Sequence, residues 1–575
     1  MQKFLFYLAI LGYGTACNGP AKKQPDQTPP NAAAIGCMPQ TTDKAWYSAG
    51  TKAPLLAGLD GIDFKISTNN KEAQAYFNQG MMLSYGFNHA EAARSFFEAT
   101  RLDSTCAMAH WGFAYVLGPN YNAGMEDDNY QRAYQAVQKA IALSGNATAK
   151  EKALITALSS RYAAAPPASR ADLDIAYARS MKQVYETYPG DPDISALYAE
   201  SLMDMHPWDL YDKKTKAPKP WTPEIVDVLE KLIKQYPRHP GAPHFYIHAV
   251  EASDKPERGL AAAELLMTLV PGAGHLVHMS SHIYIWTGDY HLGSLSNLAA
   301  IKADSTYITA CHAQGAYPLA YYPHNYHYLS ATATFEGNSK LAWRAAKEVQ
   351  EKTAKDIMVQ PGWGTLQHYY SVPYFVAVKF GLWDSILAIK NLPGDLIYPR
   401  AILHYARGMA FMGKKDITKA EAELARLKEL AKDTVLKTMT IWNINSMSDI
   451  TQIAMHVLSA EVYRDKKDYN KAIDEYNKAI VIEDNLNYNE PPDWFFSVRH
   501  HLGAALLQAG RYGEAEKIYE QDLYIWKENG WALMGLYEAL KKQGKATAAQ
   551  VKSRFDKAWR YADIDIHLVL SDNEG

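Results

Sequence analysis

The 575-residue chain has few cysteines, no surplus of positive charge and no long apolar run beyond its first residues. Four cysteines without a CxxC pair exclude a disulfide framework and a thiolate metal site. With 59 Lys+Arg against 62 Asp+Glu, the net charge is −3. No basic field is therefore present to release counterions from a phosphate backbone, and we expect no nucleic-acid partner.

The familiar motifs of nucleotide-binding proteins and hydrolases are also missing. The sequence contains no GxxxxGK[ST] loop, no GxGxxG after a strand, no GxSxG elbow and no HExxH helix. We therefore expect no nucleotide cofactor. A hydrophobic fraction of 48% beside 21% charged residues still predicts a folded chain.

The N-terminus has the pattern of a secretory signal. Residues 1–17 begin with Lys3, continue through the apolar stretch Phe4–Leu11 and end in small residues before Cys17. The ending resembles a bacterial lipoprotein signal, with Gly14 where that pattern usually has Leu. The resemblance implies lipidation of Cys17, a membrane anchor and a place in the cell envelope, as an outer-membrane lipoprotein facing periplasm or exterior. Plain secretion is the alternative.

The segment after this signal differs in composition from the rest of the chain. Residues 18–45 are rich in Pro, Gln, Thr and Ala, which predicts a disordered tether. If Cys17 is lipidated, Cys37, Cys106 and Cys311 remain, and this odd number allows at most one bridge.

The remaining sequence consists of amphipathic helical patterns separated by short turns. A step of 34 residues relates Leu502, Leu506, Gly510 and Ala515 to Leu536, Leu540, Gly544 and Ala549. This step, with small residues at fixed places, resembles the tetratricopeptide repeat (TPR), most strongly over Tyr76–Leu102 and Met455–Asp563. The resemblance implies an all-α solenoid, in which helix hairpins stack into a right-handed superhelix.

The predicted repeats fall into three regions of the chain. N-terminal repeats occupy 46–190, a histidine-rich central region with insertions occupies 191–400, and C-terminal repeats occupy 401–575. Two stretches that break the period, Asp209–Thr222 and Ser305–Tyr317, are expected to be loops on one rim that could act as a lid.

The central region carries an unusual cluster of histidines with helical spacing. The cluster consists of His244, His248, Glu251, His275, His278, His282, His324, His327 and His368. Spacings of three, four and seven place residues on one face of a helix. The TPR resemblance implies that the first helix of each hairpin lines a concave groove. Eight of the ten histidines from His244 to His368 fall at such groove positions, and only His291 and His312 do not.

Imidazole and carboxylate groups at this density favour a transition-metal site, with Fe, Cu or Zn as the candidate ions. One predicted grouping joins His244, His248 and Glu251 with His278 or His282. Another joins the pair His275 and His278 with the pair His324 and His327. Glu251 is the candidate base if the site is catalytic. A metal-free polar groove that binds a peptide, a protein or a small molecule is the alternative.

Four further groove positions are weaker candidates. Trp286 and Phe335 could form an apolar wall, or they could fill seams between repeats. Arg499 and His500 begin a helix after Pro491-Pro492-Asp493-Trp494 and could contact a carboxylate.

Longer segments extend the resemblance beyond single repeats. HPGAPHFYIHAVEAS, PGAGHLVHM, YYPHNYHYL and PPDWFF resemble segments of uncharacterised secreted or lipoprotein bacterial TPR proteins, which imply no particular activity. The sequence thus predicts a cell-envelope solenoid whose groove binds a ligand through histidines and a metal. The alternative is a metal-free scaffold for protein or peptide binding at the membrane.

Overall fold

The computed structural model describes residues 44–311, 317–390, 396–494 and 496–566. The predicted signal peptide, Cys17, Cys37 and nearly all of the predicted tether lie outside these residues. Within them, Cys106 is a buried free thiol. The side chain of Cys311 is not described.

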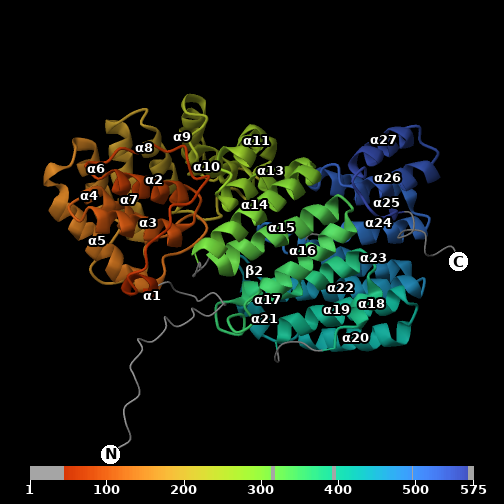
Figure 1. Ribbon diagram of the computed structural model, residues 1–575. Coiled ribbons are helices and arrows are strands. Elements are labelled where there is room, and N and C mark those ends of the chain that lie inside the picture. Colours follow the sequence, from red (N-terminus) through yellow and green to blue (C-terminus); the bar gives the residue numbers. More distant parts are fainter. Residues whose placement is uncertain (1–43, 312–316, 391–395, 495, 567–575) are drawn as a thin grey trace, which may run out of the picture. The chain divides into compact units, whose positions relative to one another are not determined.

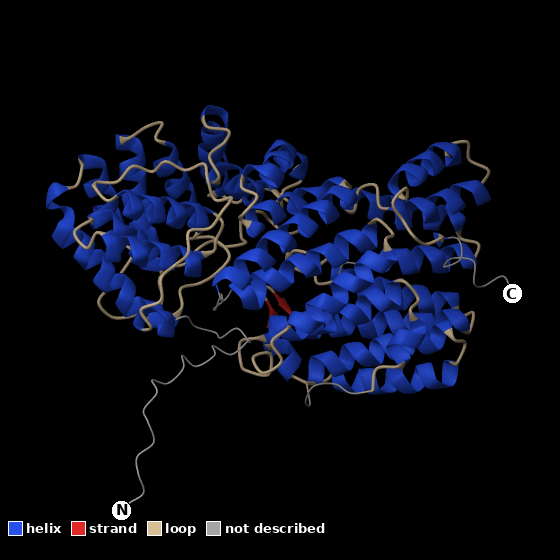
Figure 2. Cartoon of the chain, in the orientation of Figure 1, coloured by secondary structure: helices blue, strands red, loops and turns tan. Residues whose placement is uncertain are grey.

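The described chain is almost entirely helical, with one two-stranded ribbon (Figure 2). The first half contains α1 (Lys44–Ser48), α2 (Lys71–Tyr85), α3 (His89–Leu102), α4 (Ala107–Val116), α5 (Tyr130–Leu143), α6 (Ala149–Ser159), α7 (Ala171–Thr187), α8 (Pro192–Met203), α9 (Thr222–Gln235), α10 (Gly241–Val250), α11 (Leu260–Leu269), α12 (Gly274–His278), α13 (Ser280–Thr287) and α14 (Tyr290–Cys311). The second half contains α15 (Tyr322–Phe335), α16 (Ser339–Lys352), α17 (Gly364–Lys379), α18 (Trp383–Leu387), α19 (Ile397–Gly413), α20 (Ile417–Leu430), α21 (Val435–Thr438), β1 (Thr440–Ile441), β2 (Asn445–Ser446), α22 (Met447–Asp465), α23 (Tyr469–Glu483), α24 (Val498–Gln508), α25 (Tyr512–Ile525), α26 (Gly530–Lys542) and α27 (Ala548–Ala558). Strands β1 and β2 pair antiparallel.

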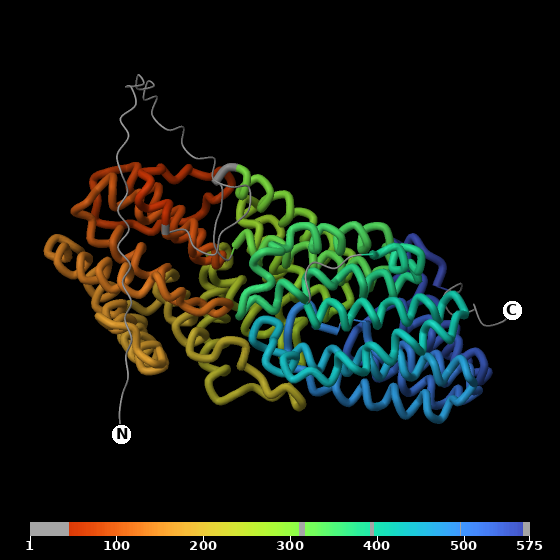
Figure 3. The backbone as a smooth tube through the Cα atoms, turned by 90° about the horizontal axis from the view of Figure 1, so that it is seen from below, coloured from red at the N-terminus to blue at the C-terminus, as the bar shows by residue number. Residues whose placement is uncertain are grey.

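Consecutive helices pair into hairpins, and each hairpin packs on the next one along the chain (Figures 1 and 3). Many of the turns inside hairpins contain one residue with positive φ. These residues are Phe87, Gly288, Gly337, Gly381, Lys415, Lys467, Gly510 and Gly544. A left-handed residue is a usual way to end a helix, because it satisfies the last carbonyl groups. The recurrence of this turn shows that the hairpins are structural repeats even where their sequences differ.

Small residues on neighbouring helices allow large side chains to fill the seams between hairpins. Tyr519 of α25 packs against Gly503 of α24 and Gly535 of α26. A Cβ atom added to either glycine would lie 2.4 or 2.1 Å from the Tyr519 ring. Leu502, Leu506, Leu536 and Leu540 are buried as the 34-residue period predicts.

Two details of the sequence interpretation are wrong. Ala549 is exposed, although its counterpart Ala515 is buried. Helix α27 begins four residues after Gly544, whereas α25 begins two residues after Gly510, so Val551 faces inward instead. The expected loop Ser305–Tyr317 is also helical at its start, because α14 continues to Cys311. The other expected loop, Asp209–Thr222, is irregular and is held by an isolated bridge between Tyr211 and Pro218.

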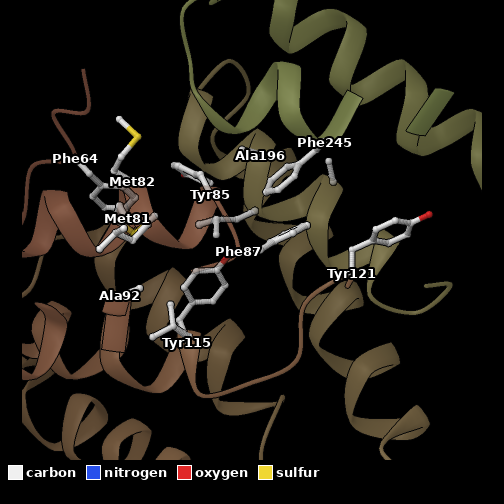
Figure 4. Packing of buried hydrophobic residues seen from close by; sticks show 14 of the residues in the cluster. Phe64, Met81, Met82, Tyr85, Phe87, Ala92, Tyr115, Tyr121, Ala196 and Phe245 are labelled. Atoms are coloured by element: carbon white, nitrogen blue, oxygen red, sulfur yellow. The ribbon is translucent and has the colours of Figure 1, made fainter. Parts of the chain in front are cut away.

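The buried apolar side chains form two clusters along the chain. The first extends from Ala53 to Tyr321 and the second from Ile285 to Ile566, so their sequence ranges overlap between α13 and α15. Figure 4 shows part of the first cluster, in which the rings of Phe87 and Phe245 stack with centroids 5.7 Å apart. Among the described residues, no helix combines the length and apolar character needed to cross a bilayer.

A buried carboxylate joins three helices of the C-terminal repeats. Glu461 of α22 accepts hydrogen bonds from Tyr476 of α23 at 2.7 Å and from His501 of α24 at 2.8 Å, and it pairs with Arg464 at 2.5 Å. Burial alone would raise the pKa of Glu461, but Arg464 and the two hydrogen bonds outweigh it and lower the pKa to about 2.

Glu461→Gln is expected to lower the thermal unfolding midpoint at pH 7. A depressed carboxyl pKa stabilises the fold above the ordinary value of 4.5, and this stability is lost as the pH falls toward 2. The contribution is on the order of 3 kcal/mol. The difference between wild type and variant should therefore shrink between pH 5 and pH 3. Glu520→Gln, on the exposed face of α25, is the control, and a difference independent of pH would contradict this role of Glu461.

Candidate metal centre

The clustered histidines lie on the first helices of successive hairpins, as the TPR resemblance implies. His244 and His248 lie on α10, and Glu251 follows its last residue. His275 and His278 lie on α12, which is separated from α13 and His282 only by Met279 in helical conformation. His324 and His327 lie on α15, and His368 lies on α17.

The imidazoles do not line an open groove. His244, His248, His275, His278 and His282 are all at most 3% exposed. They are covered by aromatic side chains from elsewhere in the chain. Ring centroids lie 4.5 Å apart between Phe87 and His244, 5.2 Å between Tyr121 and His248, and 5.6 Å between Trp208 and His248.

Two of these covering residues have strained backbones. Phe87 has φ +53° and Trp208 has φ +59°. A bulky residue in the left-handed region costs about 1–3 kcal/mol. The surrounding packing therefore maintains both aromatic rings over the imidazoles against a local penalty.

Three groups of side chains bring potential ligand atoms within 4.8 Å of one another. We call His244, His248 and His275 the first histidine triad, and His278, His282 and His324 the second histidine triad. His248, Glu251 and His282 form the third group and link the two triads.

Hydrogen bonds orient two imidazoles of the first histidine triad. His244 donates from Nδ1 to the carbonyl oxygen of Tyr85 at 2.5 Å, and His248 donates from Nδ1 to Glu251 Oε1 at 2.8 Å. The Nε2 atoms of both residues and both ring nitrogens of His275 have no hydrogen-bond partner within the described chain. Metal-binding histidines commonly show this arrangement, in which one ring nitrogen is anchored and the other carries a free lone pair.

The hydrogen bonds of the second histidine triad show which of its ring nitrogens carry a proton. Asn297 donates from Nδ2 to the carbonyl oxygen of Gly293, so its Oδ1 accepts from His278 Nδ1 at 2.7 Å. His278 Nε2 therefore carries a lone pair and accepts from His282 Nε2 at 2.9 Å. His282 also donates from Nδ1 to Glu251 Oε2 at 2.6 Å. Both of its nitrogens donate, so His282 is an imidazolium.

A second buried carboxylate, Glu490, completes this part of the site. Glu490 pairs with His282 Nδ1 and accepts hydrogen bonds from Tyr328 at 2.9 Å and from Trp286 at 2.8 Å. Burial disfavours the charge on His282, but Glu490 and Glu251 outweigh it and raise its pKa to about 10. Burial also raises the pKa of both carboxyls.

The other imidazoles are neutral. Burial, with added repulsion from neighbouring imidazoles, lowers the pKa of His244, His248, His275, His278 and His324 well below its ordinary value. A neutral imidazole is the form that binds a metal ion.

Two predicted ligands lie outside the triads. The His327 ring lies 5.5 Å from that of His368, whose Nδ1 is 2.8 Å from the hydroxyl of Tyr398. The predicted grouping of His275 and His278 with His324 and His327 is therefore wrong in including His327. The rings of His278 and His324 do meet, with centroids 4.8 Å apart. His327, three residues after His324, instead reaches α17.

The four weaker candidates have different surroundings. Trp286 reaches the site through Glu490. Phe335 stacks on Trp526 at 5.0 Å, and Trp286 stacks on the same ring at 4.6 Å, so both side chains also fill a seam between repeats. Arg499 donates to Asp484 at 2.7 Å, and His500 contacts Asp522 at 2.9 Å, which places both in contact with carboxylates of this chain.

Sequence reasoning missed Glu490 and Asn297. Glu490 lies in the irregular segment after α23, directly before the Pro491-Pro492 pair. Asn297 lies on α14, the second helix of its hairpin. No spacing relates either residue to the histidines, although an acidic residue beside a Pro-Pro pair in a break of the repeat was a signal that could have identified Glu490.

Two cavities adjoin the first histidine triad. His275 lines one of them together with Gly274, Asp304 and Tyr307. Phe87 and Tyr321 line the other, and their rings lie 5.9 and 5.1 Å from the His275 ring. His275 is thus the imidazole of this triad that lines a cavity, although both of its ring nitrogens are buried.

The comparison with protein families supports the repeat assignment. Residues 453–485 match the tetratricopeptide repeat family. Together with the stacked hairpins, this match shows a tetratricopeptide repeat at residues 453–485, and the described part of the chain is an all-α TPR solenoid. No curated protein matches the sequence.

Several solved structures are similar to this chain at low identity. Human IFIT1, solved as a dimer with m7Gppp-AAAA, is 14% identical, with 87% of this chain and 92% of that chain covered and a TM-score of 0.30. Cut9 from an APC/C heterotetramer with Hcn1 is 12% identical, with coverage of 86% and 78% and a TM-score of 0.28. Yeast Tom70 is 11% identical, with coverage of 86% and 93% and a TM-score of 0.27. These low TM-scores add nothing to the assignment, and the expected absence of a nucleic-acid partner gains no support.

Glu490→Gln is expected to destabilise the metal-free protein by on the order of 2 kcal/mol. The substitution removes a carboxylate from a buried imidazolium and turns an amide N–H group toward a donor. Chemical denaturation monitored by tryptophan fluorescence measures the effect. Glu264→Gln, on the exposed side of α11, is the matched control and should have no effect. Equal stability of the two variants would show that Glu490 does not balance the His282 charge.

Proposed function

We propose that this TPR protein binds a transition-metal ion through the first histidine triad. The observation that carries the proposal is the meeting of three buried, neutral imidazoles, two of which have Nδ1 anchored and Nε2 without a partner. Leaving several buried nitrogens without partners is costly in a folded protein, and a bound ion would satisfy them.

The donor set favours zinc or copper. Three imidazole nitrogens suit either ion. Iron would be favoured by two histidines and a carboxylate, but both oxygens of Glu251 already accept N–H groups of His248 and His282. We therefore assign Glu251 a positioning role in place of the predicted roles of ligand and base. It orients the imidazoles that would hold the ion.

The three ligands would leave one coordination position for a small molecule. Sites with three protein ligands and an open position are typical of zinc that acts on a substrate. His275 also lines a small cavity next to the first histidine triad. The protein would then bind a small ligand at its metal ion, and the solenoid would position the histidines in addition to offering surfaces to protein partners.

Elemental analysis of the full chain, purified without a metal-binding tag, tests the proposal. The wild type should retain Zn or Cu. His248→Ala should lower the affinity of the first histidine triad for the ion by at least roughly 100-fold, because removing a ligand weakens metal binding more than removing the residue that orients the ligand. His404→Ala, which alters a partly exposed histidine paired with Glu423, is the control. Absence of metal in the wild type after reconstitution would overturn the proposal and leave a metal-free scaffold that binds a protein or peptide.

We also propose that the chain is anchored in the cell envelope through lipidated Cys17. The signal pattern of residues 1–17 supports this location. Cys17→Ser should move the protein from the membrane fraction to the soluble fraction of its host, whereas Cys37→Ser should leave it in place. Unchanged fractionation of Cys17→Ser would contradict the anchor.

A further inference from the structure

The six imidazoles of the two triads form one continuous cluster. Neighbouring ring centroids are 5.0 Å apart for His244 and His248, 5.0 Å for His244 and His275, 5.8 Å for His275 and His278, 4.8 Å for His278 and His324, 4.8 Å for His278 and His282, and 5.6 Å for His282 and His248. One ion cannot bind all of these residues, because its ligands must lie about 2.0–2.1 Å from it.

The second histidine triad has the spacing of a metal site in its own right. Nε2 of His278 and Nε2 of His282 lie 2.9 Å apart. Two nitrogens bound to the same ion at about 2.0–2.1 Å lie roughly 2.9–3.4 Å apart. A single proton of the His282 imidazolium now joins these nitrogens. A metal ion could take its place without a large movement of either ring, and this proton would then be released to solvent. A ring nitrogen of His324 lies within 4.8 Å of the ligand atoms of both residues.

Anchors outside the cluster orient this pair in the same way as in the first histidine triad. The Nδ1 atom of His278 donates to Asn297, and the Nδ1 atom of His282 donates to Glu251. Both Nε2 atoms therefore face the cluster. Such anchoring is the usual support for histidine ligands of metals.

Glu251 links the two triads directly. Its Oε1 accepts from His248 of the first triad and its Oε2 accepts from His282 of the second. A single carboxylate thus orients one imidazole in each group, and Glu490 adds negative charge beside the second. When both are ionised, the two buried carboxylates offset the charge of one divalent ion.

We infer that the cluster holds two adjacent transition-metal ions, the second bound by His278, His282 and His324. This inference rests on the proposed function, since it adds a second ion beside the first. Asn297 and Glu251 act as positioning residues for the second site, and Glu251 serves both sites.

Metal stoichiometry in matched variants tests the second site. The full chain is loaded with Zn²⁺ or Cu²⁺ and freed of excess ion, and bound metal is measured by mass spectrometry. Two equivalents are expected in the wild type, one in His244→Ala, one in His324→Ala and none in the double variant. His368→Ala, a buried histidine outside both triads, should retain two.

Electron paramagnetic resonance of the Cu²⁺ form gives an independent readout. Two adjacent Cu²⁺ ions couple, so the wild type should show a weakened or broadened signal. His244→Ala and His324→Ala, which should each bind one ion, should show the normal signal of an isolated Cu²⁺ ion. If His324→Ala does not fold, as judged by circular dichroism, Asn297→Leu serves instead and should weaken binding of one ion by about 10–100-fold.

The outcomes separate the two proposals. One equivalent in both the wild type and His324→Ala, lost in His244→Ala, would overturn the second site and leave the first intact. If the wild type binds one equivalent and both His244→Ala and His324→Ala lose it, the two triads form a single site. This result would also overturn the inference. Absence of metal in every form would overturn both proposals.

Discussion

The hydrogen bonds of the Glu251 carboxylate are the interaction on which the candidate site depends. Each oxygen accepts an N–H group from a different helix, His248 on α10 and His282 on α13. These bonds set the tautomer of His248 and, with Glu490, stabilise His282 as an imidazolium inside the protein. Without this carboxylate, a buried imidazolium would lose part of its compensation, and the Nε2 atom of His248 would no longer be directed toward His244 and His275.

The site also depends on closure of the groove by distant parts of the chain. Phe87 comes from the turn after α2, Trp208 from the segment after α8, and Glu490 from the segment after α23. Their contacts change the chemistry of the histidines. In an open groove, water would solvate the imidazoles and keep their pKa near the ordinary value. In the buried cluster most of them are neutral and carry lone pairs, and the one charged ring lies between two carboxylates.

The repeat period predicted most of the helical architecture, and its failures have local causes. Hydrophobic periodicity predicts which face of a helix packs inward, and Leu502 and Leu536 are buried on that face. Ala549 departs from the period because two extra residues precede α27 and rotate its face. The helical spacing grouped His244, His248 and Glu251 with His278 or His282, and the structure does bring His248, Glu251 and His282 together, but His244 and His248 also meet His275. The spacing could not separate His327 from the triads. Three residues after His324, that side chain has turned far enough around α15 to meet His368 instead.

The sequence by itself determined most of the helices and the repeat, and the TPR resemblance implied the placement of the histidines on the first helices of successive hairpins. These features follow from residue spacing along a single helix axis, which is a local property. Only the tertiary structure decided which imidazoles meet, which nitrogens are anchored and what covers them. Those contacts join Tyr85 to His244, His278 to Asn297 and His282 to Glu490. They depend on how hairpins stack and on where irregular segments return to the solenoid, and no spacing within one helix contains that information.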